Sequence, residues 1–278
     1  MIYAIKKIIK KMGQSISPKD VIAIDRIVSA DHEFEGKNVF ISGGSGGIGL
    51  AIARLLLESG ANVVLGGTNQ EKLDSCVRDL GYDGRVSSVV IDLLDIAGVE
   101  SAVAAVTSCY GGVDILIVSS GVHTENVDLW SMTPEEYDRV MAVNLKGSFF
   151  LAREVAKQMI ALNKKGHILF VGSSRGFEPA WSPYGISKWG LRGLTEGLAQ
   201  ILMPYGIVVN GIAPGSTATS LIGVSDGDSI ASGENGAGRL VMPAEVASWA
   251  KMLVGAPGDM VIGETVLVSA GRGRIDVR

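Results

Sequence analysis

A tyrosine, a lysine and a serine stand in this sequence at spacings that suit proton transfer. Tyr184 and Lys188 lie four residues apart at the start of a predicted helix, and Ser173 ends the strand before it. Residues at this helical spacing share one face. A neighbouring cation lowers the tyrosine pKa from about 10, and a serine hydroxyl can hydrogen-bond a substrate oxygen that gains charge. The three residues predict acid–base chemistry at a substrate oxygen, although a tyrosine–lysine pair alone also arises by chance.

A dense run of glycines separates an apolar strand from a helix at residues 42–49. Glycines let the backbone turn sharply, and the free N–H groups and dipole of a helix N-terminus favour a phosphate anion. The run fits more than one glycine spacing, but its position between strand and helix predicts a dinucleotide site. The residues expected to contact the dinucleotide in this loop are Gly43, Ser45, Gly47, Ile48 and Gly49.

The end of the second predicted strand bears on the choice between NAD and NADP. A site specific for NAD usually carries an acid here, about 20 residues past the loop, to bind the ribose hydroxyl. This chain has Gly67, Thr68 and Asn69 instead, with no acid and no basic residue. Thr68 and Asn69 can offer neutral hydrogen bonds. The sequence therefore predicts that either cofactor binds, with a weak preference for NADP.

The elements that must position these residues alternate between strands and helices. Such alternation predicts a doubly wound, mostly parallel, Rossmann-like α/β sheet, with ligands beyond the carboxyl ends of the strands. The predicted strands are Val39–Ser42, Val63–Leu65, Val86–Asp92, Asp114–Ser119, His167–Gly172, Ile207–Ile212 and Thr265–Val268. The predicted helices are Ile48–Glu58, Gln70–Leu80, Ala97–Cys109, Pro134–Leu162, Pro183–Met203 and Ala244–Leu253. We expect a single domain over residues 34–278.

The composition narrows the classes of function. Hydrophobic residues make up 47% of the 278 residues, enough for a large core. The net charge of -4 argues against a nucleic-acid partner. Cys76 and Cys109 form neither a disulfide framework nor a metal-ligand cluster, so we expect no metal site and a reduced, cytoplasmic compartment. We expect no membrane-spanning helix and no signal peptide.

Residues 1–33 differ from the rest and are predicted to form an N-terminal helical extension. Residues 1–12 carry apolar side chains at helical spacing with four lysines between them. A basic amphipathic helix can lie on an anionic membrane surface or pack on a protein. We favour packing on the chain's own or a neighbouring subunit, because the apolar face is short.

From about Phe34 onward, the sequence resembles the short-chain dehydrogenase/reductase family in its single-domain form. The resemblance rests on the glycine loop at Gly43, Gly47 and Gly49, and on Ser173, Tyr184 and Lys188. It implies a dinucleotide-binding oxidoreductase domain that transfers a hydride between NAD(P) and the carbonyl or alcohol carbon of a small molecule. It also implies that Tyr184 is the general acid or base and that the protein is a homo-oligomer.

The resemblance assigns roles to further residues. Asn144 matches a helix asparagine that supports a water in the proton relay, and Tyr184 and Lys188 would also contact the nicotinamide ribose. Ser173 is chosen over Ser174 because it stands three residues before Gly176. The other residues implied at the cofactor are Asp92 and Leu93 near the adenine, Gly121 after the fourth strand, and Pro214, Gly215 and Thr219 at the carboxamide.

The chain departs from the family pattern after the fourth strand, where only Gly121 of the usual motif is kept and serines replace asparagines. His123, Phe177 and Trp181 are expected near the mouth of the site. Residues 216–238 are expected to form a mobile lid whose neutral to acidic character provides no positive cradle for a phosphorylated substrate. Two alternatives stay open: a dinucleotide-binding sensor or assembly protein with little catalysis, and a sugar-nucleotide epimerase or dehydratase, although few residues follow Tyr184 for its larger substrate domain.

Overall fold

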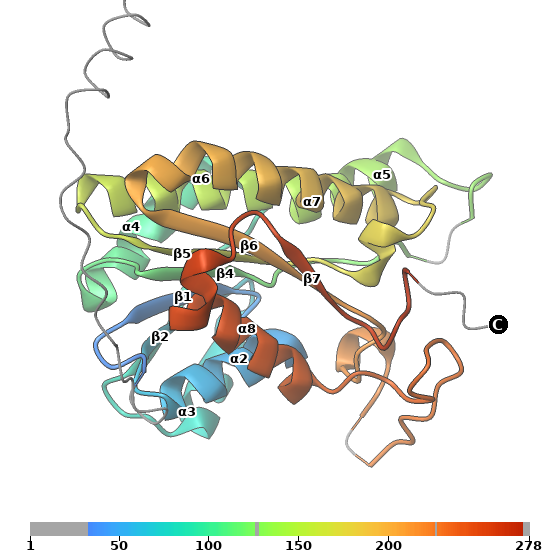
Figure 1. Cartoon of the computed structure of the whole chain (residues 1–278), viewed down its shortest axis with the longest axis horizontal. Helices are drawn as coiled ribbons and strands as arrows, with labels where there is room; N and C mark the ends of the chain where they lie inside the picture. Colours follow the sequence, from blue (N-terminus) through green and yellow to red (C-terminus); the bar gives the residue numbers. More distant parts are fainter. Residues whose placement is uncertain (1–32, 126–127, 226, 275–278) are drawn as a thin grey trace, which may run out of the picture.

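The computed structural model describes residues 33–125, 128–225 and 227–274, which form one seven-stranded sheet between two layers of helices (Figure 1). Every strand pairs in parallel with its neighbours, in the order β3-β2-β1-β4-β5-β6-β7. The strands are β1 Asn38–Ser42, β2 Asn62–Gly67, β3 Val86–Val90, β4 Ile115–Val118, β5 Gly166–Val171, β6 Ile207–Pro214 and β7 Thr265–Val268. The predicted doubly wound fold is confirmed. The predicted helices of residues 1–32 lie outside the described residues.

The helices bury one apolar side each against the sheet, and the alternation of strand side chains divides the core in two. Val39 and Ile41 pack toward α2, α3 and α8, whereas Phe40 packs toward α4, α6 and α7 (Figure 1). The helices are α2 Gly47–Glu58, α3 Gln70–Leu80, α4 Val99–Tyr110, α5 Pro134–Met141, α6 Ser148–Ala161, α7 Pro183–Leu202 and α8 Pro243–Val254.

The long helical region predicted from Pro134 is present, but it is not a uniform α-helix. A π-helical segment, Ala142–Gly147, separates α5 from α6. The wider π turn changes which side chains face the sheet, and such segments are frequent at functional sites. Here it buries the side chain of Asn144 completely.

The strand order reverses direction between β1 and β4. Chain segments leave β1 toward β2 and β3 on one side, and leave β4 toward β5, β6 and β7 on the other. Loops at such a switch point diverge and open a crevice at the carboxyl ends of the strands. The glycine loop after β1 and the segment after β4 both lie there.

The segment between β6 and α8 covers this edge of the sheet. It contains a short 3-10 helix, Ser220–Ile222, and two isolated bridges, which pair Thr217 with Val241 and Ala231 with Arg239. The predicted mobility of this lid stays a prediction. Within the described ranges, no helix combines the length and the apolar character needed to cross a bilayer.

Candidate active site

The glycine loop is shaped by close backbone packing. Gly43 has a φ of 71°, and a Cβ built on it would lie 2.7 Å from the backbone of Ser119 and Ser120 after β4. A Cβ on Gly49 would lie 2.3 Å from the carbonyl oxygen of Gly43. A Cβ on Gly47 would lie 2.6 Å from Cγ2 of Thr219. Any residue other than glycine at these three positions would collide with these atoms and force the loop or the Thr219 side chain to move.

The start of α2 is also suited to an anion. Its N-cap is Gly46, which offers no side chain to the first N–H groups, and the first turn carries no acid. These N–H groups and the helix dipole are therefore available to a phosphate. The loop and the helix terminus together fit the pyrophosphate of a dinucleotide.

The carboxyl ends of β2 and β3 form the neighbouring part of the crevice. The Ser45 hydroxyl lies 3.5 Å from the Cβ position of Gly67, and Thr68 is exposed beside it. Asn69, by contrast, is engaged as the N-cap of α3, since its Oδ1 accepts a hydrogen bond from Lys72 N at 2.8 Å. Thr68 is thus better placed than Asn69 to offer a neutral hydrogen bond.

The predicted adenine-side residues differ from each other in exposure. Asp92 is exposed, and its Oδ1 accepts a hydrogen bond from Leu94 N at 2.9 Å. Leu93 is buried, and a Cβ on Gly147 would lie 2.6 Å from Leu93 Cβ. Asp92 is therefore available to a ligand, whereas the side chain of Leu93 belongs to the core.

Asn144 connects the segment after β4 to the first turns of α7. Its Oδ1 accepts a hydrogen bond from Val122 N at 2.8 Å, and its Nδ2 donates to Val122 O and to Ser187 Oγ. Ser187 Oγ in turn donates to the carbonyl oxygen of Tyr184 at 2.7 Å. A Cβ on Gly121 would lie 3.4 Å from Asn144 Oδ1 and 3.5 Å from Lys188 Nζ. Gly121 thus leaves room between the asparagine and the lysine.

Tyr184 stands in the first turn of α7, which begins with the N-cap Ser182 and Pro183. Its ring stacks on His123, with the ring centroids 4.2 Å apart. Burial lowers the pKa of His123, as do Lys188 and Arg175, so this imidazole is neutral at pH 7. The stacking fixes the plane of the phenol without placing a charge beside it.

The expected lowering of the Tyr184 pKa by Lys188 is wrong in this structure. Burial raises the pKa of Tyr184, and the influences that lower it are a hydrogen bond with Ser173 and the charges of Arg175 and Arg272. Lys188 Nζ lies 5.5 Å from the centre of the phenol ring and donates to Val171 O at 3.3 Å. Burial also lowers the pKa of Lys188 to about 8. Burial therefore affects the pKa of Tyr184 more than the lysine one helical turn away does.

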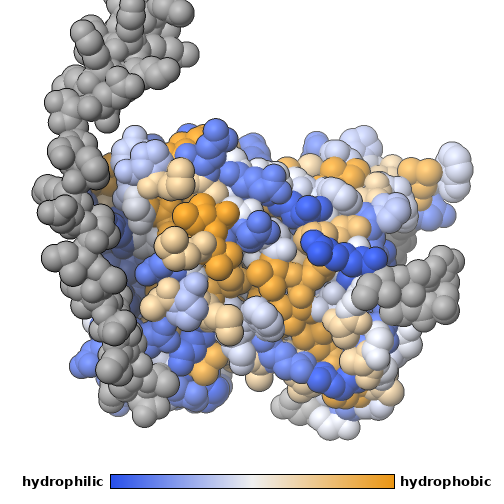
Figure 2. Space-filling view, viewed as in Figure 1, coloured by the Kyte–Doolittle hydropathy of each residue, from blue (hydrophilic) through white to orange (hydrophobic). Residues whose placement is uncertain are grey.

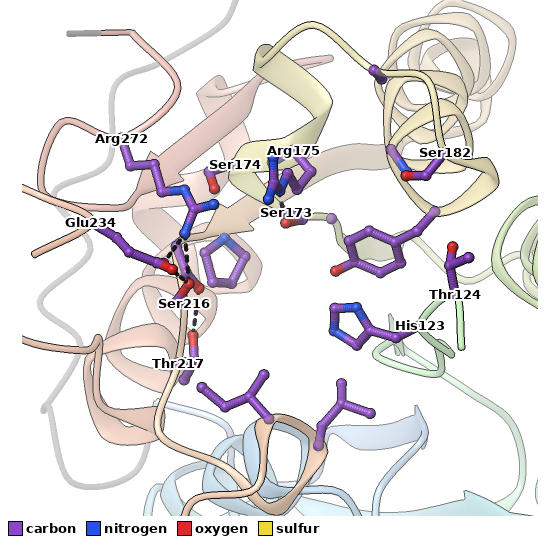
Figure 3. A pocket seen from close by; sticks show the side chains of 18 of the residues that line it. His123, Thr124, Ser173, Ser174, Arg175, Ser182, Ser216, Thr217, Glu234 and Arg272 are labelled. Carbon is purple, nitrogen blue, oxygen red and sulfur yellow. Dashed lines mark hydrogen bonds and ion pairs between the residues drawn. The ribbon is translucent and has the colours of Figure 1, made fainter. Parts of the chain in front are cut away.

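A cavity of about 380 Å³ is lined both by residues predicted to bind the cofactor and by residues predicted to be catalytic (Figure 3). His123 and Trp181, both expected at the mouth, line it, but Phe177 instead packs under the guanidinium of Arg192, 3.9 Å from its ring centre. The cavity lining includes six of the predicted site residues: Ile48, Ser173, Tyr184, Pro214, Gly215 and Thr219. The cofactor end and the catalytic end of the site therefore share one opening.

Comparison with known proteins identifies the family. A model of the short chain dehydrogenases matches residues 37–227. The 3-oxoacyl-(acyl-carrier-protein) reductase of Vibrio cholerae is 32% identical over 241 residues, which cover 85% of this chain and 97% of that protein. The chain belongs to the short-chain dehydrogenase/reductase family.

Two solved structures show how closely this family fold is kept. A gluconate 5-dehydrogenase from Burkholderia cenocepacia, in complex with NADP and tartrate, has a TM-score of 0.78 and 32% identity, covering 87% of this chain and 97% of that one. A 3-ketoacyl-(acyl-carrier-protein) reductase from Brucella melitensis, complexed with NADH, has a TM-score of 0.77 and 28% identity, covering 86% and 99%. This short-chain dehydrogenase/reductase is an NAD(P)-dependent oxidoreductase that transfers a hydride between the cofactor and a carbonyl or alcohol substrate.

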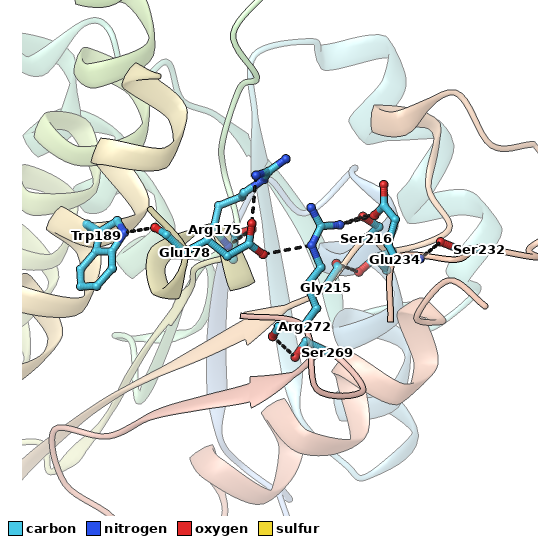
Figure 4. A network of polar contacts seen from close by, with 11 residues as sticks. Arg175, Glu178, Trp189, Gly215, Ser216, Ser232, Glu234, Ser269 and Arg272 are labelled. Carbon is cyan, nitrogen blue, oxygen red and sulfur yellow. Dashed lines mark hydrogen bonds and ion pairs between the residues drawn. The ribbon is translucent and has the colours of Figure 1, made fainter. Parts of the chain in front are cut away.

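Sequence reasoning missed the charged residues of the cavity wall in this short-chain dehydrogenase/reductase. Arg272, after β7, donates from Nε to Glu178 Oε1 at 3.0 Å and from Nη1 to Ser216 Oγ at 2.7 Å (Figure 4). The same nitrogen pairs with Glu234. Arg175 Nη1 donates to the other oxygen of Glu178 at 2.9 Å. Apart from Arg175 and Glu178, which are three residues apart, these residues come from segments that are distant in sequence, and no spacing motif connects those segments.

The network also changes the expected charge of the substrate mouth. The lid by itself is neutral to acidic, as predicted, but Arg175 and Arg272 reach the same cavity from other segments. The expectation concerned the lid alone, and the positive groups of the cavity come from outside it. Two guanidinium groups and the carboxylate of Glu234 line the cavity together.

Proposed function

We propose that Tyr184 is the general acid or base of this oxidoreductase. In reduction its hydroxyl donates a proton to the carbonyl oxygen, and in oxidation it accepts one from the alcohol. When bound, the nicotinamide supplies or accepts the hydride at the adjacent carbon. The observation that carries this proposal is the position of Tyr184: its half-buried phenol lines the same cavity as Ser173 and the Pro214–Gly215 segment.

The neighbouring residues support distinct parts of this proton transfer. Ser173, which interacts with the Tyr184 hydroxyl, orients the substrate oxygen. Lys188, a buried cation behind Gly121, binds the ribose hydroxyls of the nicotinamide half. Asn144 holds the Val122 backbone and Ser187, and so positions the start of a relay of protons to solvent.

For the cofactor we propose a modest preference for NADP over NAD. A carboxylate at the end of β2 would repel a 2′-phosphate, and Gly67 provides none. The solved gluconate dehydrogenase holds NADP and the solved ketoacyl reductase holds NADH, so the fold accepts either. Gly43, Ser45, Gly47, Ile48 and Gly49 would hold the pyrophosphate, with Thr68 and Asp92 toward the adenosine end.

We further propose that the protein is a homo-oligomer in a reduced, cytosolic compartment. A band of hydrophobic residues follows the edge strand β7 and the helix α8 (Figure 2), and an unpaired edge strand is a ready surface for association. Its exposed members include Trp249, Met252 and Ile262. Cys76 and Cys109 are free thiols, which suits a reducing environment.

Replacement of Tyr184 by phenylalanine tests the catalytic proposal. Tyr184→Phe removes one oxygen and keeps the stacked ring, so folding and cofactor affinity should persist while turnover falls by about 10²–10⁴-fold. Turnover is measured from nicotinamide absorbance with a panel of carbonyls and alcohols. Tyr205→Phe, at an exposed tyrosine after α7, is the matched control and should keep full turnover. Near wild-type turnover in Tyr184→Phe would rule out this role.

A further inference from the structure

We propose that the substrate of this enzyme carries a carboxylate, and that the guanidinium of Arg175 binds it beside the reacting carbonyl. The inference rests on the proposed function, because it places the carbonyl oxygen at Tyr184 and Ser173. It adds the chemical class of the substrate, an oxo acid or the corresponding hydroxy acid, and a residue that selects it.

The first support is the position of Arg175. Its backbone N–H donates to Ser173 Oγ at 3.2 Å, so the residue begins at the hydroxyl that orients the substrate oxygen. Its side chain lines the cavity together with Tyr184. Figure 3 shows Arg175 beside Ser173, between His123 on one side and the Arg272–Glu234 pair on the other. A group bound to Arg175 therefore lies in the cavity that Ser173 and Tyr184 also line.

The second support is that Arg175 keeps hydrogen-bond donors available. Its side chain is 52% exposed, and within the part of the chain that the structure describes its one carboxylate partner is Glu178, through Nη1. A guanidinium has five N–H donors in a planar fork that suits a carboxylate. Glu178 is moreover shared with Arg272. Arg175 can therefore bind a second carboxylate without losing its link to Glu178.

Arg272 differs from Arg175 in this respect. Its side chain is 16% exposed and is bonded to Glu178, Glu234 and Ser216. These bonds tie the segment after β7 to the β6–α8 segment and to the residues before α7 (Figure 4). Arg272 thus has a structural role, with three of its five N–H groups bonded, whereas Arg175 is the more exposed guanidinium and keeps more donors unused.

The balance of charge favours a carboxylate over a phosphate. Arg175, Arg272, Glu178 and Glu234 form a network whose two positive and two negative charges cancel. A phosphate dianion would meet Glu234 in the same cavity and would find one exposed guanidinium, that of Arg175, to receive it. A single negative charge is matched by the unused donors of Arg175. Trp181 and Leu221, which also line the cavity, offer apolar contacts to the rest of the substrate among the serines and threonines of the lining.

Paired substrates that differ only in this charge test the inference. We would assay the full chain with NADPH and with NADH on 2-oxobutanoate, 3-oxobutanoate and 4-oxopentanoate and on the methyl ester of each. We expect kcat/KM to be higher for at least one acid than for its ester. Arg175→Gln should lower the acid-to-ester ratio of kcat/KM by about 10- to 100-fold, the size expected for a hydrogen bond to a charged group. Arg175→Lys should restore part of that ratio.

Arg78→Gln provides the control, because it removes an exposed cation from α3, away from the cavity, and should leave the ratio unchanged. Melting temperature and cofactor affinity of each variant show whether it is folded. The inference is wrong if no acid is preferred over its ester, or if Arg175→Gln lowers acid and ester turnover equally. Tyr184→Phe on the same substrates separates the two ideas: its failure to lower turnover would overturn the catalytic role, whatever the acid-to-ester ratio shows.

Discussion

The two ends of the active-site crevice are built in opposite ways. At the end of β1 the site consists of backbone, and its residues contribute by lacking side chains: Gly43, Gly47 and Gly49 each stand where a Cβ would lie within 2.7 Å of another atom. At the ends of β5 and β6 the site consists of side chains, with a half-buried tyrosine, a buried lysine and a charged network beside them. The first end leaves space for a bound group, and the second carries the side chains proposed for proton transfer.

This difference predicts how each end responds to change. At Gly43 and Gly49 an added methyl group would meet backbone atoms, which cannot yield as a flexible side chain can, whereas at Gly47 it would meet the side chain of Thr219. Side chains in a cavity can be exchanged for others of similar shape, with the loss confined to one proton, one charge or one hydrogen bond. Substitutions in the glycine loop should therefore act on structure, and those at the catalytic wall on pH dependence or selectivity.

Among substitutions expected to act on structure, the largest effect is expected for Gly49→Ala. Its Cβ would lie 2.3 Å from the carbonyl oxygen of Gly43 and 3.0 Å from the Gly43 carbonyl carbon, so the loop must move. We expect stability to fall by about 1–3 kcal/mol from overpacking. Displacement of the bound cofactor should lower turnover by about 100-fold, as misplacement of reacting groups commonly does. Urea unfolding and cofactor titration measure the two effects.

Gly197→Ala is the matched control for this substitution. Gly197 lies in the exposed part of α7 with nothing within 4 Å of its Cβ position. Alanine there should stabilise the helix by up to about 1 kcal/mol and leave cofactor affinity unchanged. Equal behaviour of the two variants would remove the distinction between a packed loop and a permissive helix.

A smaller and pH-dependent effect is expected at Lys188. Its pKa is lowered from 10.5 to about 8 by burial, so between these pH values the unfolded chain holds more protons than the folded chain. The contribution of Lys188 to the free energy of unfolding therefore rises with pH across this interval. Lys188→Met, which removes the buried charge, should be more stable than wild type below pH 8. That advantage, roughly 3 kcal/mol at most, should shrink as pH rises.

The measurement is urea unfolding of the cofactor-free protein below pH 8 and between pH 8 and 10.5. The difference between wild type and Lys188→Met isolates the lysine, because Tyr184, whose raised pKa has the opposite slope above pH 10, is present in both. Lys165→Met, at an exposed lysine at the amino ends of the strands, should show no such difference in slope. A stability gap that is constant with pH would show that Lys188 does not titrate in the folded state.

The same contrast explains what the sequence could predict. Tyr184 and Lys188 are one helical turn apart, and the glycine loop is a continuous segment, so local spacing was enough to place them. The alternation of strands and helices was likewise sufficient for the doubly wound sheet. The π-helical segment around Asn144 was not predicted, because no local motif in Ala142–Gly147 distinguishes it from the α-helices on either side.

The charged residues of the cavity wall show most clearly what could not be predicted from the sequence alone. Arg175, Glu178, Glu234 and Arg272 meet because the sheet topology brings three separate segments to one edge. Only Arg175 and Glu178, three residues apart, have a spacing that marks them as neighbours. The direction of the shift in the Tyr184 pKa likewise depends on burial, which the helical spacing of Tyr184 and Lys188 did not reveal.

The smallest effect is expected for substitution of Gly67, the last residue of β2, and it concerns the choice between NAD and NADP. A Cβ there would lie 3.5 Å from Leu73 Cδ2 and Ser45 Oγ, which is ordinary contact, so an aspartate fits where Gly49→Ala does not. Gly67→Asp should shift the ratio of NADP to NAD affinity toward NAD by about tenfold, through repulsion of a 2′-phosphate and a hydrogen bond to the ribose. Gly67→Asn has the same size without the charge, and titration of both cofactors against all three proteins separates repulsion from bulk. If asparagine shifts the ratio as far as aspartate does, or if the wild type already strongly prefers NAD, charge at the end of β2 does not set cofactor choice. A shift confined to aspartate would show that even the backbone-built end of the site is tuned by a single side chain wherever the packing leaves room for one.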